Sequence, residues 1–201
     1  MACQGEKQAW DILTKIDHQV VQSNADVFFN HEKATYEMTC FGQCIYISLY
    51  DRNIYGKSHL GKFLINELGE ISRLSILRYL IQAKDVSLSG KLVRPSDLPG
   101  GAIFIKGTHV LPLDRIIKRF DNNSEDFYSK GKEVGSTQLD YGDMSLKLFV
   151  FPRVPLVFIV WSGNEEFPSN CSLLFDSSCT LHLATDIIWS TAMMSVEILL
   201  S

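Results

Sequence analysis

The chain has 201 residues, which is enough for one large domain with a sizeable core. Apolar residues make up 46% and charged residues 21%, close to the globular average, so a disordered, collagenous or coiled-coil chain is excluded. The formal net charge of -4 argues against nucleic acid or an anionic membrane as a main partner.

The chain start and its apolar runs indicate the compartment. No basic stretch precedes an apolar core at the start, which argues against a secretory signal. The apolar runs 154–161 and 187–200 fall short of the ~20 residues that a membrane span needs. The odd count of 5 cysteines fits a compartment that keeps thiols reduced. We therefore expect a cytoplasmic chain with no membrane partner.

The first expected element is an amphipathic helix over 6–21, within an N-terminal helical segment 1–22. Trp10, Leu13, Ile16 and Val20 recur at helical spacing there. The polar run 22–24 then predicts a turn. Segments 36–41 and 44–50 are rich in aromatic and β-branched residues, and predict a hairpin whose type II′ loop is Gly42-Gln43.

The rest of the chain alternates helical and strand signals. Helices are expected over 71–83, over 113–120, from Ser124 to near Gly131 or Gly135, and from Thr185 to about 200. Strands are expected over 144–151, 154–161 and 171–175. Segment 154–161 is apolar on both faces, which predicts a central strand with both sides covered. Without regular βαβ alternation, we expect an α+β fold, a mainly antiparallel sheet with flanking helices, as a single domain over 1–201.

The cysteine spacing argues against a metal site. In the expected hairpin, Cys40 and Cys44 point to opposite sides of the sheet, so they share neither a metal nor a disulfide. Cys171 and Cys179 have no second close pair to complete a four-thiolate site. We expect no zinc ion or iron-sulfur cluster to be held by this chain alone.

The densest polar chemistry lies in the C-terminal region. Arg153 stands between Pro152 and Pro155, which restrict its backbone and favour an anion site; the alternative is a surface ion pair with Glu165 or Glu166. Further candidate ligand-binding residues are Trp161, Glu165, Glu166 and the loop Pro99, Gly100 and Gly101, whose glycines permit a close approach. No metal site is favoured, and the alternative set is Asp176, His182 and Glu166.

Several of these segments together resemble a known prokaryotic family. They are Phe151-Pro-Arg-Val-Pro155, Trp161, Glu165-Glu-Phe-Pro168 and Leu174-Phe-Asp176, with Leu77-Arg-Tyr-Leu-Ile-Gln-Ala83 and Leu98-Pro-Gly-Gly101 before them. This pattern resembles the domain of unknown function numbered 3786, from about residue 35 onward, with its signature in 144–201. The resemblance implies anaerobic metabolism, with corrinoid or one-carbon chemistry and an iron-sulfur or corrinoid protein as partner.

Two function classes follow. The first is an accessory protein that binds a cofactor, such as a corrinoid or another tetrapyrrole, or a partner protein, through the candidate ligand-binding residues. The second is a metal-assisted hydrolase or transferase that uses Glu165, Glu166, Asp176 and His182.

Overall fold

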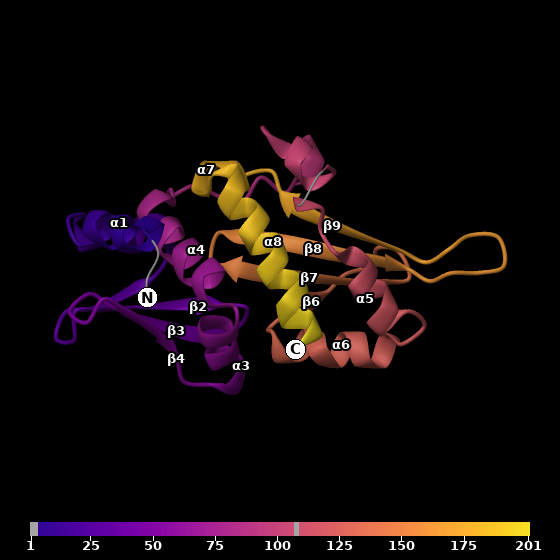
Figure 1. Ribbon diagram of the computed structural model, residues 1–201, viewed down its shortest axis with the longest axis horizontal. Helices are drawn as coiled ribbons and strands as arrows, with labels where there is room; N and C mark the ends of the chain where they lie inside the picture. Colours follow the sequence, from indigo (N-terminus) through magenta and orange to yellow (C-terminus); the bar gives the residue numbers. More distant parts are fainter. Residues whose placement is uncertain (1–3, 107–108) are drawn as a thin grey trace.

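The computed structural model describes residues 4–106 and 109–201 and contains two antiparallel sheets with flanking helices. This confirms the expected α+β class. In Figure 1 the four-stranded sheet lies below α1 and α4, and α8 crosses in front of the five-stranded sheet. Cys3 lies outside the described residues.

The N-terminal segment forms two helices rather than one, α1 (Gln4–Leu13) and α2 (His18–Ala25). The predicted single helix over 6–21 is wrong because Asp17 caps a new helix: its carboxylate accepts a hydrogen bond from the Gln19 amide at 2.8 Å. The polar run 22–24, predicted as a turn, lies inside α2. The chain turns instead at Asp26, which takes a left-handed φ of 54°.

The first sheet has the order β1-β2-β3-β4. Its strands are β1 (Phe28–Asn30), β2 (Thr35–Cys40), β3 (Gln43–Ser48) and β4 (Asn53–Gly56). The predicted hairpin is confirmed, but its loop is Phe41-Gly42, one residue earlier than expected. Both loop residues have positive φ, 48° and 69°, which is type I′ rather than type II′ geometry. Cys40 is buried and Cys44 exposed, on opposite sides as predicted.

A helical layer follows the first sheet. It begins with α3 (His59–Lys62) and a π-helical turn, η1 (Phe63–Glu67), and continues into α4 (Gly69–Gln82). Later helices are α5 (Leu113–Phe120), α6 (Ser124–Glu133), α7 (Cys179–His182) and α8 (Thr185–Leu200). Four of these helices, α4, α5, α6 and α8, match predicted segments.

The second sheet has the order β5-β9-β8-β7-β6. Its strands are β5 (Leu92–Val93), β6 (Thr137–Gln138), β7 (Met144–Phe151), β8 (Val154–Trp161) and β9 (Asn170–Asp176). The prediction that 154–161 is central is confirmed, and every residue of β8 except Trp161 is buried. The 3-10 turns η2 (Pro95–Asp97) and η3 (Gly101–Phe104) lie between β5 and α5.

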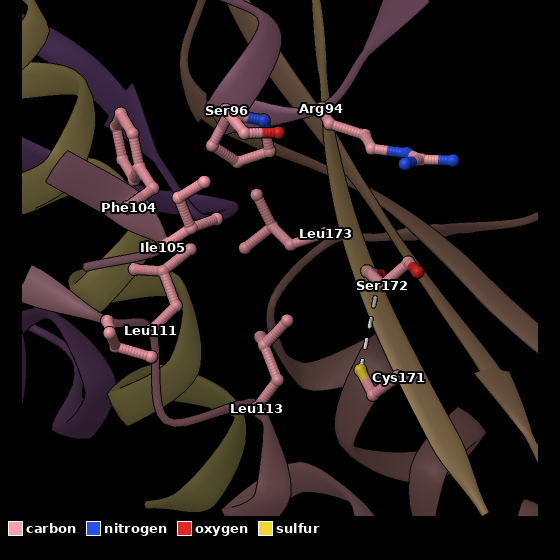
Figure 2. Close-up of a pocket in the computed structure, with 11 residues that line it drawn as sticks. Arg94, Ser96, Phe104, Ile105, Leu111, Leu113, Cys171, Ser172 and Leu173 are labelled. Atoms are coloured by element: carbon pink, nitrogen blue, oxygen red, sulfur yellow. Dashed lines mark hydrogen bonds between the residues drawn. The ribbon is translucent and has the colours of Figure 1, made fainter. Parts of the chain in front are cut away.

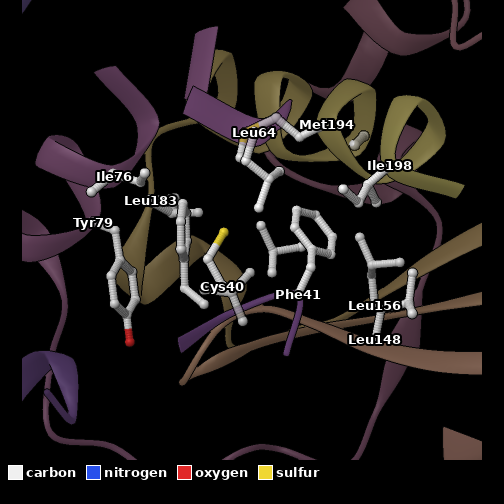
Figure 3. Packing of buried hydrophobic residues seen from close by; sticks show 14 of the residues in the cluster. Cys40, Phe41, Leu64, Ile76, Tyr79, Leu148, Leu156, Leu183, Met194 and Ile198 are labelled. Carbon is white, nitrogen blue, oxygen red and sulfur yellow. The ribbon is translucent and has the colours of Figure 1, made fainter. Parts of the chain in front are cut away.

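One core joins the two sheets. The amide of Phe41 donates to the Phe149 carbonyl at 3.0 Å, which links the end of β2 to β7. Figure 3 shows Phe41 packed near Leu64 of η1, Ile198 of α8 and Leu156 of β8. Burying these large side chains contributes about 1.5–3 kcal/mol each, so the shared core couples the two sheets energetically.

Candidate functional site

An apolar groove of about 360 Å³ lies along β9, beside the segment that connects β5 to α5. Its apolar lining includes Phe104, Ile105, Leu111, Leu113 and Leu173. Figure 2 shows these side chains converging on one side of β9. The volume lies within the range of about 300–1,000 Å³ that ligand sites occupy.

The rim of the groove carries unusual exposed groups. Ile105 and Val110 are 61% and 52% exposed, which is high for large aliphatic side chains at a concave site. Arg94 and Ser172 also line the groove, and in Figure 2 the Arg94 side chain extends across β9, away from Leu173 and Leu113. The Arg94 side chain is exposed. Among the described residues, none accepts a hydrogen bond from its guanidinium and none forms an ion pair with it. The groove therefore has an apolar side and a cationic side, separated by β9.

Pro95 explains why β5 is so short. Val93 of β5 is paired with Phe175 of β9, so the register places Pro95 opposite Leu173. A proline has no N–H and cannot donate to the Leu173 carbonyl. β5 therefore ends before this position, and the chain turns away through η2.

The outer edge of β9 consequently has no strand partner beyond Phe175 among the described residues, although Cys171 and Leu173 are themselves buried. The Ser177 amide donates to the Lys91 carbonyl at 2.8 Å, which fixes the alternation of paired and unpaired positions along β9. By this alternation Cys171 and Leu173 direct their backbone N–H and C=O groups outward. Within residues 4–106 and 109–201, no strand pairs with these four groups. They lie beside the groove, which both residues line.

The cysteine of the groove is not poised for covalent chemistry. Burial raises the pKa of the Cys171 thiol to about 12. A thiol is a nucleophile only as the thiolate, so Cys171 is unreactive near neutral pH.

Arg153 connects segments of the fold. Its guanidinium donates to the Asn24 carbonyl at 2.8 Å, to the Ser23 carbonyl at 2.9 Å and to the Asp85 carboxylate at 2.6 Å. Its amide donates to the Tyr79 hydroxyl at 3.1 Å. Its ion-pair partner is Asp85 and not Glu165 or Glu166, the alternative considered from the sequence. The sequence predicts that this rigid turn binds an anion. The guanidinium donors of Arg153 instead bond to backbone carbonyls and to the Asp85 carboxylate of the protein itself.

The other C-terminal candidates lie at the far end of the sheet. Trp161 is the last residue of β8, and Arg153 directly precedes the first residue of β8. A strand rises about 3.3 Å per residue, so the two ends of β8 lie roughly 23 Å apart. Glu165 and Glu166 are exposed on the loop between β8 and β9, which protrudes at the right of Figure 1. The structure therefore does not bring Arg153 together with Trp161 and the two glutamates.

The loop Pro99, Gly100 and Gly101 packs against η2 and the start of α8. The Thr185 hydroxyl donates to the Pro99 carbonyl at 2.8 Å, which ties the loop to the start of α8. A Cβ at Gly101 would lie 2.2 Å from the Pro95 carbonyl oxygen. The close approach expected from these glycines is therefore made to η2, the turn that follows β5.

Asp176 and His182 are buried and lie at the Arg153 end of the sheet. Burial would raise the pKa of Asp176, but hydrogen bonds from Ser178 and Ser89 hold it well below its usual range. Burial and then the Arg153 charge lower the pKa of His182. Glu166 is at the opposite end of β9, so the alternative metal set does not converge. In the described part of the chain, no three His, Cys, Asp or Glu side chains are placed to hold one ion.

No local pattern in the sequence indicates the groove. Its residues come from 94–113 and from β9, and only the pairing of β5 with β9 brings them together. One signal was present: Pro95 comes two residues after the short apolar pair Leu92-Val93, as at the end of an edge strand.

The observed fold defines the class of protein as α+β with two antiparallel sheets. The chain belongs to the family described as a domain of unknown function (DUF3786), whose family model matches residues 17–198. Comparison with curated proteins and with solved structures gives no match. Across the described ranges, no helix has both the length and the apolar character to cross a membrane.

Proposed function

We propose that this chain is a binding protein whose recognition site is the groove along β9. The observation that carries the proposal is the apolar groove of about 360 Å³, bordered by Arg94, whose guanidinium has no partner in the part of the chain that the structure describes. Ligands that fit this chemistry have an apolar body and an acidic group. Binding removes the exposed surface of Ile105 and Val110 from water, which stabilises the complex by roughly 25 cal/mol per Å² of apolar area.

Octanoate is a simple probe of this site, because it has an apolar chain and a carboxylate. We expect octanoate to shift the amide NMR signals of residues that line the groove. Ile105→Glu places a carboxylate on the apolar side and should weaken octanoate binding tenfold or more. Octylammonium, with the opposite charge, should bind more weakly because Arg94 repels it.

Tyr50→Glu is the matched control, since Tyr50 is 89% exposed and lies outside the groove lining. This variant should bind octanoate like the unchanged chain. Equal weakening by the two substitutions, or signal shifts confined to other surfaces, would contradict the proposed site.

A corrinoid or other tetrapyrrole ligand and an iron-sulfur or corrinoid protein partner stay predictions of the family resemblance. An absorption spectrum of protein purified without oxygen tests for such a cofactor. The metal-assisted hydrolase or transferase has less support, because Glu165 and Glu166 lie away from Asp176 and His182.

A further inference from the structure

We infer that this chain has a second ligand site, a polar cavity of about 470 Å³ that binds small molecules with a carboxylate or phosphate group. The cavity lies where the first sheet and α3 meet α6 (Figure 1). Its lining includes Gln43 of β3, Ser58 and His59 at the start of α3, and Lys130 and Glu133 of α6. The two sites share none of their described lining residues, so this inference does not depend on the groove along β9.

Lys130 is the residue that points to an anionic ligand. Only 7% of its side chain is exposed. Its ammonium group carries three N–H donors, and among the described residues a single acceptor bonds to it, the Glu133 carboxylate at 3.0 Å. Two donors of this buried cation therefore remain for whatever occupies the cavity. A buried charged donor without acceptors is costly, so the occupant of the cavity supplies acceptor atoms.

Glu133 is a partner that an incoming anion can replace. Its side chain is 56% exposed, so its carboxylate stays hydrated when it turns away from Lys130. The two residues are three positions apart on one helix, and ion pairs with an exposed partner are weak. A ligand anion in the cavity lies beside the buried ammonium group, where less water screens the attraction. Water also supplies acceptors, but only an anion balances the charge of Lys130 once Glu133 turns outward.

A chain of hydrogen bonds holds the walls of the cavity together. The Ser58 hydroxyl donates to Oε1 of Gln43 at 2.7 Å and accepts from the Gly61 amide at 3.0 Å. The Gln43 side-chain amide donates to the Glu133 carbonyl at 3.0 Å. These bonds tie β3 to both α3 and α6, so the walls are ordered before a ligand binds and binding costs less entropy. His59 adds a ring N–H donor to the lining.

Titration with inorganic phosphate and with citrate tests this inference, and the tighter of the two probes identifies the preferred anionic group. We expect at least one probe to bind with a Kd below about 1 mM and to shift the amide NMR signals of Ser58, His59 and Lys130. Lys130→Met keeps an aliphatic side chain but removes the charge, and should weaken binding about tenfold or more. Glu133→Gln removes the competing carboxylate and should strengthen binding.

Lys132→Met is the matched control, because Lys132 is exposed on the same helix and lies outside the cavity lining. This variant should bind the probe like the unchanged chain. Equal weakening by Lys130→Met and Lys132→Met would show general attraction to basic side chains and would overturn the site. Binding of both probes weaker than about 1 mM, or signal shifts confined to other surfaces, would also overturn it. If Lys130→Met does not fold, unchanged or weaker binding by Glu133→Gln decides against the inference.

Discussion

Replacing Arg153 with alanine is expected to lower the free energy of unfolding by about 2–4 kcal/mol. The guanidinium donates to the carbonyls of Ser23 and Asn24 at the end of α2 and to Asp85 after α4, and the side chain is only 19% exposed. Its removal leaves these acceptors without their donor and separates the turn between β7 and β8 from α2. Urea unfolding followed by circular dichroism measures the change.

Arg52→Ala is the matched control, because Arg52 forms a single ion pair with Asp11 and both side chains are about half exposed. Exposed pairs of this kind contribute roughly 0–1 kcal/mol. Arg153→Lys keeps the charge but loses the fork of donors, so an intermediate loss is expected. A loss for Arg153→Ala no greater than that for Arg52→Ala would contradict the structural role assigned to Arg153.

Asp176→Asn is expected to destabilise the fold by about 2–3 kcal/mol at pH 7. The buried carboxylate accepts hydrogen bonds from the Ser89 hydroxyl at 2.7 Å, the Ser178 hydroxyl at 2.6 Å and the Gly90 amide at 2.8 Å. These bonds hold the loop before β5 against the end of β9. The asparagine side chain lacks the negative charge, and its NH₂ group would face hydroxyl and amide groups that are themselves donors.

The same carboxylate predicts a pH dependence. Hydrogen bonds that outweigh burial lower the folded-state pKa of Asp176, below the unfolded value of about 3.9. Its stabilising contribution is therefore complete above the unfolded pKa and is lost as the pH falls below it. The difference between the unchanged chain and Asp176→Asn should shrink between pH 5 and pH 2.5. Asp143→Asn, which alters one exposed carboxylate bonded to the Ser162 amide, is the control. A difference that does not change with pH would contradict this assignment.

The sequence predicted those elements whose signals are local. β7 and β8 were predicted at their observed bounds, because apolar runs and the connecting Pro152-Arg153 mark them directly. α5 was also predicted at its observed bounds, from an acidic first turn and a basic last turn. The break between α1 and α2 has no glycine or proline and depends on capping by Asp17, so helical periodicity alone runs across it.

The candidate site was harder to predict for a physical reason. Polar residues close in sequence, such as Arg153 and Trp161, form one group of candidates, and the sequence leaves open whether they converge; an extended strand separates them. The groove joins residues about 70 positions apart through the pairing of Val93 with Phe175. This register does not follow from a local pattern.

Amide NMR spectra recorded while octanoate is added test the central claim most directly, because the claim is that the groove along β9 binds a ligand with an apolar body and an acidic group. The account predicts that the amide signals of groove residues such as Ile105, Leu113 and Ser172 shift, and that Ile105→Glu weakens octanoate binding tenfold or more while Tyr50→Glu does not. Shifts confined to other surfaces, or equal binding to Ile105→Glu and to the unchanged chain, would contradict the account.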